Sequence, residues 1–277
     1  MVALFGQVTA MKILSFDIGG SKISSAVIDQ NGDFLRRVKT HPTPESSQQI
    51  FDLLQSECSD NEYSGAALAT AGIVENNNLP SKPYNLPNGY ENIDFSALFR
   101  TNYLIENDAN AAAWAEFKKG NMQNCRHGVL LTLGTGVGCG IICDSRLLRG
   151  KHGAAGEIYM DCSGNSMRKM AVASGIADTD CFSVYKSAQS GDVAALKVYN
   201  AWHDQLFKGM RQINQLLDTE MFVLSGSLAK IVDFSGINHR LQSEIPNNPP
   251  LVRPAHYGND AGLVGAALLY GEKYEEI

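Results

Sequence analysis

The stretch 12-KILSFDIGGSKISSAVID-29 decides the fold. Its flanks, Lys12–Asp17 and Lys22–Asp29, have the apolar and β-branched composition of paired strands, and the two glycines between them supply a tight turn. We expect a third strand at Asp33–Lys39, which would complete a meander of antiparallel strands.

A second hairpin repeats this arrangement later in the chain. His127–Thr132 and Cys139–Cys143 have strand composition, and the turn 134-GTGVG-138 joins them. The two turns begin at Gly19 and Gly134, which are 115 positions apart. This weak internal repeat predicts an α/β protein of two lobes, each starting with a hairpin.

The rest of the chain predicts further strands and helices. Asn76–Asn92 is rich in Asn, Pro and Gly, and loops of that length are usually functional. Ser46 is a plausible N-cap for the first helix. We expect strands at Tyr63–Thr70, Tyr103–Glu106 and Glu220–Leu224, and helices at Ser46–Cys58, Phe95–Arg100, Ala109–Lys118, Asp192–Asp218, from about Leu228 onward and at Ala261–Tyr270.

The composition disfavours several classes of protein. A chain of 277 residues that is 44% hydrophobic can bury a core without disulfides and is too apolar for disorder. Its 23 basic and 29 acidic residues give a net charge of −6, which argues against a nucleic-acid partner. No apolar run predicts a membrane span, and the start lacks the basic segment of a signal peptide. We therefore expect a cytoplasmic protein with no membrane partner, in which Met11 is the natural start and residues 1–11 form a disordered tail.

The six cysteines form no CxxC pair. Without a secretion signal we expect them to be free thiols in a reducing compartment.

The first turn carries groups that suit a phosphate and a metal ion. Gly19 and Gly20, followed by Ser21 and Lys22, direct peptide N–H groups toward one point, which favours phosphate binding. Asp17 at the strand end is placed to hold Mg²⁺ through water. The plainer alternative is a hairpin whose aspartate bonds its own turn.

The second turn is richer still in glycine. The stretch that begins with Gly134, Thr135, Gly136 and Val137 contains four glycines in eight residues. So many glycines are unfavourable in a strand region unless the backbone must approach a ligand. The Thr135 hydroxyl and nearby amides would then hold β- or γ-phosphate oxygens. A twisted edge hairpin is the alternative.

Polar residues at strand ends and loops supply further candidates. Asp108 follows a strand, where its carboxylate can accept a proton from a substrate hydroxyl. Asn107 can orient a neighbouring hydroxyl of the same substrate. Helix capping is the alternative and explains either residue equally. Asn85 and Glu157 lie in turns and suit sugar hydroxyls, or are simply solvated. Gly226 follows a strand and would let an adenine ring approach a helix start.

The order of these motifs resembles that of the ROK family of bacterial sugar kinases, within the actin-like ATPase superfold. The resemblance extends from Lys12 to about Tyr270, and the two glycine-rich turns with the Asn-Asp-Ala-Asn-Ala block are its most specific parts. In chain order the motifs are Asp17-Ile-Gly-Gly-Ser-Lys, Thr70-Ala-Gly, Asn85-Leu-Pro, Glu106-Asn-Asp-Ala-Asn-Ala, Gly134-Thr-Gly-Val-Gly, Gly153-Ala-Ala-Gly-Glu, Ser225-Gly-Ser and Gly258-Asn-Asp-Ala-Gly-Leu-Val-Gly.

The resemblance implies an α/β, two-lobed actin-like ATPase (ribonuclease H-like) fold with a central cleft. The smaller lobe would comprise residues 12–108 and about 258–277, and the larger one residues 109–257. ATP phosphates would lie between the two turns, and Asp108 would be the general base for a hexose or N-acetylhexosamine hydroxyl, usually the 6-hydroxyl. The other implied roles are sugar binding for Asn85, Asn107 and Glu157, Mg²⁺ for Asp17 and adenosine for Gly226. Positioning and charge neutralisation are what phosphoryl transfer mainly needs.

The chain departs from the family in one segment. Many members follow Gly-Glu with a His, three zinc-binding Cys and a later Glu that contacts sugar. Here Tyr159 or Met160 takes the place of the His, only Cys162 remains of the cysteines, and Met170 replaces the Glu. A tetrahedral zinc site needs four ligands, so we expect no zinc.

Two rival functions follow from the same resemblance. Regulators of this family carry a DNA-binding helix-turn-helix ahead of the kinase-like part, and we expect no room for one before Asp17. A catalytically silent sugar-binding protein is the second rival, motivated by Met160 and Met170. By analogy with the family we expect a homodimer.

Overall fold

Five strands build one mixed sheet around the first hairpin in the computed structural model, which describes residues 10–36, 38–177 and 180–274. Residues 1–9 of the predicted tail lie outside the described residues. The central strand β1 pairs antiparallel with β2 and parallel with β4. The sheet order is β3-β2-β1-β4-β5, with β1 at Ile13–Ile18, β2 at Lys22–Ile28, β3 at Lys39–Pro42, β4 at Gly65–Thr70 and β5 at Tyr103–Asn107.

The predicted third strand at Asp33–Lys39 is wrong, because β3 begins only at Lys39. Phe34 forms an isolated bridge to Ile28, and Leu35 is 49% exposed, so this segment has little core to hold it in the sheet. The true strand lies at the sheet edge, where Pro42 is tolerated at its end.

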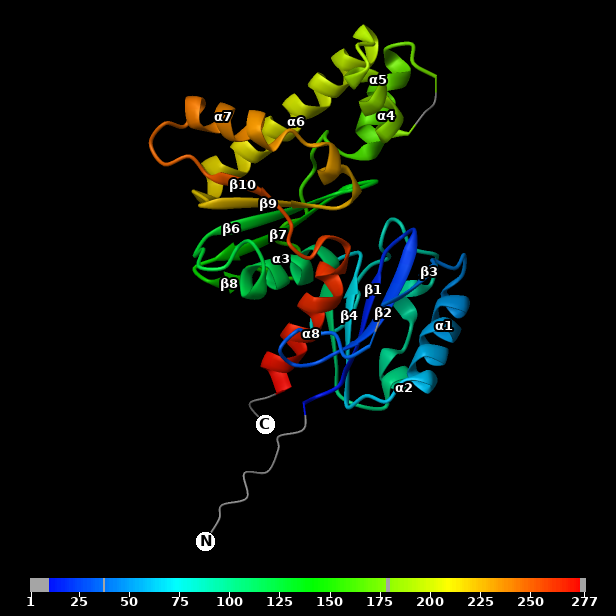
Figure 1. Cartoon of the computed structure of the whole chain (residues 1–277). Helices are drawn as coiled ribbons and strands as arrows, with labels where there is room; N and C mark the ends of the chain where they lie inside the picture. The colour runs from blue at the N-terminus through cyan, green and yellow to red at the C-terminus, as the bar shows by residue number, and fades with distance from the viewer. Residues whose placement is uncertain (1–9, 37, 178–179, 275–277) are drawn as a thin grey trace. The chain divides into compact units, whose positions relative to one another are not determined.

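Alternate residues of β1 face opposite sides of this sheet. Leu14, Phe16 and Ile18 join the core that the helices α1 (Ser47–Asp60) and α2 (Phe95–Phe99) cover. The Ser15 hydroxyl instead donates to the carbonyl of Leu263 on α8 (Ala261–Tyr274), which lies on the other side (Figure 1). The expected cap is present on α1, where Ser46 Oγ accepts from the Gln49 amide.

A second sheet repeats the first. Its order, read as β8-β7-β6-β9-β10, matches β3-β2-β1-β4-β5, and the strand directions match as well. The predicted internal repeat is therefore real. The strands are β6 at Gly128–Leu133, β7 at Val137–Cys143, β8 at Arg146–Leu147, β9 at Met221–Ser225 and β10 at Leu251–Pro254.

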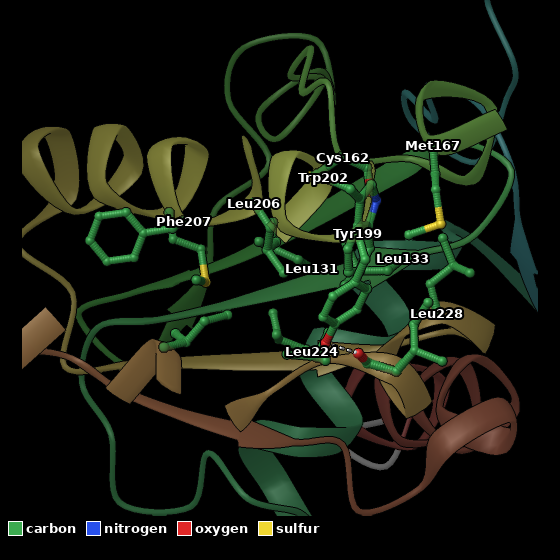
Figure 2. Packing of buried hydrophobic residues seen from close by; sticks show 14 of the residues in the cluster. Leu131, Leu133, Cys162, Met167, Tyr199, Trp202, Leu206, Phe207, Leu224 and Leu228 are labelled. Atoms are coloured by element: carbon green, nitrogen blue, oxygen red, sulfur yellow. Dashed lines mark hydrogen bonds between the residues drawn. The ribbon is translucent and has the colours of Figure 1, made fainter. Parts of the chain in front are cut away.

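The core of the second sheet is built on the long helix α6 (Val193–Leu217). Trp202 is fully buried and donates through Nε1 to the Cys162 carbonyl at 2.7 Å (Figure 2). Tyr199 of the same helix donates its hydroxyl to the carbonyl of Ile231. The other helices of this part are α4 at Gly164–Ala173, α5 at Cys181–Gln189, α7 at Phe234–Glu244 and the 3₁₀ helices η2 at Ser227–Ile231 and η3 at Gly258–Asp260.

No helix in the described ranges combines the length and apolar character that a bilayer crossing requires.

The chain divides into two compact units. The first unit comprises the residues up to Ala111 together with those from Gly262 onward, and the second comprises Ala112–Ala261. The boundary therefore falls inside α3 (Asp108–Lys119) and at the start of α8. Each unit holds one of the two sheets.

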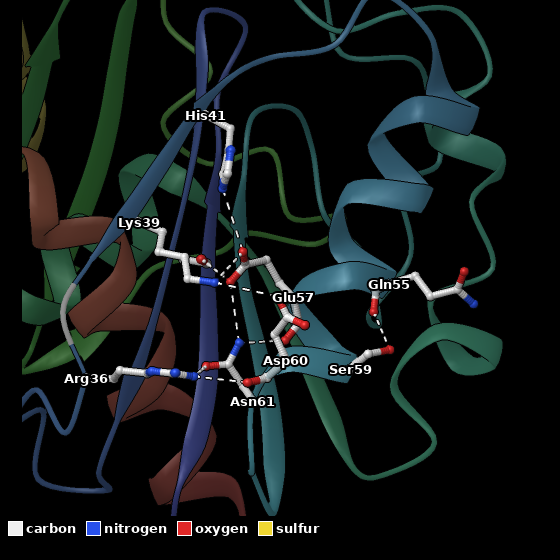
Figure 3. A network of polar contacts seen from close by, with 9 residues as sticks. Arg36, Lys39, His41, Gln55, Glu57, Ser59, Asp60 and Asn61 are labelled. Atoms are coloured by element: carbon white, nitrogen blue, oxygen red, sulfur yellow. Dashed lines mark hydrogen bonds and ion pairs between the residues drawn. The ribbon is translucent and has the colours of Figure 1, made fainter.

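A buried carboxylate stabilises the edge of the first sheet (Figure 3). Glu57 of α1 is 5% exposed, and it accepts hydrogen bonds of 3.0 Å from Ser25 Oγ and from Lys39 Nζ. His41 Nε2 lies 3.6 Å from the same carboxylate. Burial of Glu57 opposes its ionisation, but the Lys39 and Ser25 hydrogen bonds with the charges of Lys39 and His41 outweigh it and lower its pKa.

Candidate functional site

The predicted residues fall into two groups, one in each unit. The first unit holds Asp17, Gly19, Gly20, Ser21, Lys22, Asn85, Asn107 and Asp108, and the second holds Gly134, Thr135, Gly136, Val137, Glu157 and Gly226. We describe each group by itself.

The first group gathers at the carboxyl ends of parallel strands. In the register of the sheet, Ile18 of β1 lies opposite Thr70 of β4, and Thr70 lies opposite Asn107 of β5. Asp108 follows immediately as the first residue of α3. The α/β folds bind ligands at the carboxyl ends of their parallel strands, so this end of the sheet is suited to a substrate.

The first glycine turn is packed against the chain itself. A Cβ at Gly20 would lie 2.5 Å from Asn85 Cβ and 2.7 Å from the Asn85 carbonyl oxygen. The structure thus brings Asn85 and the turn together. Thr43 holds the other side, where its hydroxyl donates to the Gly19 carbonyl at 2.6 Å and its amide donates to the Ser21 carbonyl at 3.2 Å.

Asp17 points to the α8 side of the sheet. A Cβ at Gly262, the second residue of α8, would lie 2.9 Å from the carboxyl carbon of Asp17. The glycine therefore leaves room for this half-buried carboxylate beside the helix start. That location is compatible with an ion held through water.

Buried side chains fix the first turn of α3. Asn107 Oδ1 accepts from the Asn110 amide at 3.0 Å, and Asn107 Nδ2 donates to the Gly72 carbonyl. These are the bonds of the capping alternative. Glu106, which is 4% exposed, accepts from the Asn107 amide and from Asn110 Nδ2. Any sugar contact of Asn107 stays a prediction.

Asp108 is half-buried, and its Oδ1 accepts from the Ala109 amide at 2.8 Å. Its charge also acts on a tyrosine that sequence reasoning missed. Burial raises the pKa of Tyr90, and the negative charge of Asp108 adds to the rise, against the opposing hydrogen bond with Thr70. The signal for Tyr90 was its position just after the Asn85-Leu-Pro loop.

The second glycine turn is open on the side where side chains would project. A Cβ at Gly134 or Gly136 would meet no atom within 4 Å, and Thr135 at the tip is exposed. The carbonyl of Gly134 accepts from the Gly164 amide at 2.8 Å, at the start of α4. The turn is therefore anchored on one side and accessible on the other.

A pocket of about 510 Å³ lies beside this turn. The starts of α4, α5 and η2 all contribute to its wall, and helix starts favour anionic groups. Gly226 directly precedes η2 with a φ of +85°, and a Cβ there would lie 2.5 Å from the Leu133 carbonyl oxygen. The lining residues are Gly134, Thr135, Gly164, Asn165, Arg168, Asp180, Cys181, Phe182, Ser227 and Leu228.

The sequence model of the ROK family matches residues 13–159 and 160–273 of this chain. The chain belongs to the ROK family. The resemblance stated from the sequence is thereby confirmed.

Curated relatives of this ROK chain are enzymes by name. The bifunctional enzyme NanE/NanK of Brucella melitensis biotype 1 is 29% identical over 92% of this chain and 53% of its own length. The chain thus spans about half the length of the first curated relatives it matches. An N-acetylmannosamine kinase of Yersinia pseudotuberculosis serotype O:1b is 29% identical over 93% of this chain and 97% of its own.

Solved structures of the family share the fold. A ROK family protein from Streptococcus pneumoniae TIGR4, in complex with sucrose, has a TM-score of 0.81 and 24% identity over 96% of this chain and all of its own. A ROK family glucokinase from Streptomyces griseus, in complex with glucose and AMPPNP, has a TM-score of 0.75 and 22% identity over 93% and 98%. The predicted α/β, actin-like ATPase fold is confirmed.

Two methionines of the segment singled out from the sequence, residues 157–170, are packed against the protein. Met160 and Met170 are partly buried against the core of the second unit. Gly209 of α6 makes room for Met160, since a Cβ there would overlap the methionine methyl. Tyr159 instead points to solvent and is 87% exposed. Glu157 is exposed as well.

Cys162 is fully buried and its carbonyl accepts from Trp202, and burial raises the pKa of its thiol to about 12. A metal-binding thiol must lose its proton, which this environment opposes. Within residues 10–36, 38–177 and 180–274, no three His, Cys, Asp or Glu side chains lie together in a way that would hold a metal ion. That the ROK chain carries no zinc stays a prediction.

Sequence reasoning also missed the pocket residues Arg168, Asp180 and Phe182. The available signals were the N-caps Ser163 and Asp180, whose side chains accept from amides two or three residues on. These caps mark the helix starts that line the pocket.

Proposed function

We propose that the protein is an ATP-dependent carbohydrate kinase, which transfers the γ-phosphate to the 6-hydroxyl of a hexose or N-acetylhexosamine. Membership of the ROK family and the kinase names of its relatives support the reaction class. The observation that carries the proposal is the position of Asp108, half-buried at the carboxyl end of β5.

Asp108 is the proposed general base. It accepts a proton from the sugar hydroxyl as that oxygen attacks the γ-phosphorus, and the bond from phosphorus to the β,γ-bridging oxygen breaks. Asn85, which contacts the first turn, binds sugar hydroxyls from the neighbouring loop, and Asn107 and Glu157 are proposed for the same role. The Asn107 amide uses one acceptor and one donor within the protein, which leaves a second N–H for a sugar.

The second unit supplies the nucleotide half of the proposed site. Gly134, Thr135, Gly136 and Val137 are proposed to contact the ATP phosphates, because the turn is open where side chains at Gly134 and Gly136 would project. The Gly134 amide itself donates to the Gly136 carbonyl at 3.0 Å, so this contact uses other groups of the turn. The adjoining pocket accepts the nucleoside next to Gly226. The residues of the first turn proposed to contact the phosphates are Gly19, Gly20, Ser21 and Lys22.

Mg²⁺ fits Asp17, since a half-buried carboxylate at a strand end suits an ion that keeps most of its waters. When bound it would neutralise charge on the phosphates. Asp17 holds its place because Gly262 leaves room for it.

A panel of sugars tests the reaction. The protein is incubated with Mg-ATP and, separately, with hexoses, N-acetylhexosamines and β-glucosides, and ADP release is measured. We expect turnover with at least one sugar, and phosphorus NMR of the product should place the phosphate on the 6-oxygen. A phosphate on another carbon would correct the position but keep the reaction class.

A silent sugar-binding protein is the second candidate, and the packed Met160 and Met170 favour it because they replace polar sugar contacts. Calorimetry on the same panel separates the two: sugar binding without ADP release from any sugar would support the silent protein. A cytoplasmic location and a homodimer remain proposals by family analogy, and light scattering tests the dimer.

A further inference from the structure

Tyr90 follows the loop of Asn85, the proposed sugar-binding residue, and lies near the carboxyl ends of the strands β4 and β5, after which Asp108 begins α3. Its hydroxyl shares a hydrogen bond of 2.8 Å with Thr70 Oγ1, and both residues have no exposed surface. Thr70 lies opposite Asn107 in the β4–β5 register. One buried hydroxyl pair therefore joins the loop of Asn85 to Thr70, whose register partner on β5 is the residue that precedes Asp108.

The hydroxyl pair is well ordered by its surroundings. Thr70 Oγ1 also lies 3.3 Å from the Ala71 carbonyl oxygen, so it can donate there while it accepts from Tyr90. The Tyr90 ring packs edge-on against Phe95, with centroids 6.1 Å apart. Loss of one hydroxyl would leave the other buried with a missing partner, which is unfavourable.

Asp108 acts electrostatically on the same tyrosine, as its contribution to the raised pKa of Tyr90 indicates. Tyr90 bonds the end of β4 directly through Thr70, and β4 pairs there with the end of β5, after which Asp108 begins α3.

We propose that Tyr90 is a positioning residue, whose bond to Thr70 fixes the loop of Asn85 relative to Asp108. The roles of Asn85 and Asp108 rest on the proposed function. The bond itself does not, so the placement can be tested without any substrate.

Hydrogen exchange of the free protein is the first test. Tyr90→Phe keeps the ring and removes the bond, and we expect amide exchange within residues 84–92 and 107–111 to accelerate about 5-fold, the equivalent of one hydrogen bond. Tyr63→Phe is the matched control, because Tyr63 donates to the Phe99 carbonyl near the opposite end of β4. Unchanged exchange in both segments of the Tyr90→Phe protein would overturn the proposal.

Steady-state kinetics is the second test. We expect Tyr90→Phe to lower kcat about 10-fold and to raise the sugar KM about 3-fold, with the ATP KM within about 2-fold of wild type. Thr70→Val should change kcat and KM in the same way as Tyr90→Phe, whereas Thr70→Ser keeps the hydroxyl and should have the activity of the wild type. The double variant Tyr90→Phe/Thr70→Val should be no worse than either single variant, since both substitutions remove the same bond. Additive losses or wild-type kinetics in Tyr90→Phe would refute the role. If the wild-type protein phosphorylates no sugar, the kinase proposal fails while the exchange experiment still decides on Tyr90.

Discussion

The two glycine turns occupy equivalent positions in the repeated sheets, yet their surroundings differ. Gly20 of the first turn is in close contact with Asn85, and Thr43 bonds the carbonyls on either side. Gly134 and Gly136 of the second turn meet no protein atom where a side chain would project. The fold of the protein therefore requires glycine at Gly20 of the first turn, but its packing does not require glycine at Gly134 or Gly136 of the second.

This difference separates structure from function at positions that look alike in sequence. A glycine that the protein does not require for packing, and whose φ is not positive, is explained best by a ligand. In the proposed kinase, the general base Asp108 belongs to the first unit and the nucleotide pocket belongs to the second. The following substitutions test that division.

Asp108→Asn should have the largest effect. We expect kcat to fall by roughly 10²–10⁴, since a general base contributes about that factor. Asparagine can accept the Ala109 amide bond, so the melting temperature should stay near that of wild type. Sugar affinity, measured by calorimetry, should change little; near-normal turnover would remove Asp108 from the base role.

Gly136→Ala tests the second turn. The added methyl has free space in the protein, so we expect thermal stability to stay within about 0.5 kcal/mol of wild type. A methyl on the ligand side should raise the ATP KM about 10-fold, equivalent to ~1.4 kcal/mol, and leave the sugar KM unchanged. An unchanged ATP KM would mean that the phosphates bind elsewhere.

Gly20→Ala should show the opposite pattern. Its methyl would overlap Asn85, and such overpacking costs about 1–3 kcal/mol. We expect a lower melting temperature and a higher sugar KM as the loop moves. Gly19→Ala is the matched control, because its methyl would lie 3.5 Å from the Lys22 carbonyl oxygen, an ordinary contact. Equal stability of the two variants would contradict the packing argument.

Much of the fold was predictable because its signals are local. The strands beside Gly19 and Gly134 are rich in buried apolar residues, and Ser46 caps α1 as expected. The third strand was not predictable, since Phe34 and Leu35 resemble strand residues although they remain largely exposed. Its true position depends on pairing with β2 and on Glu57, which bonds Lys39.

The candidate site was predictable only in part. Motif order identified Asp108 and both turns, because these stretches are short and specific. Tyr90 belongs to none of these motifs and only follows one of them, since its importance depends on a hydrogen bond to Thr70 from another element. The packing of Gly20 against Asn85 was likewise invisible, because it joins segments far apart in sequence.

The smallest expected effect concerns stability at low pH. The first unit should be more sensitive to acid than the second, because it contains the buried Glu57 carboxylate. Glu57 has a pKa below its ordinary value of 4.5 in the folded protein, despite burial, because of the hydrogen bonds from Lys39 and Ser25 and the charges of Lys39 and His41. A carboxyl whose folded pKa is lowered stabilises the fold above the unfolded pKa, and this contribution disappears as pH falls through the folded value. At pH 7, Glu57→Gln should therefore cost about 1–2 kcal/mol of unfolding free energy. The difference from wild type should shrink as pH falls below about 4.5. Urea unfolding at several pH values measures it, and a difference that stays constant down to pH ~3 would show that the Glu57 charge contributes nothing to the sheet edge.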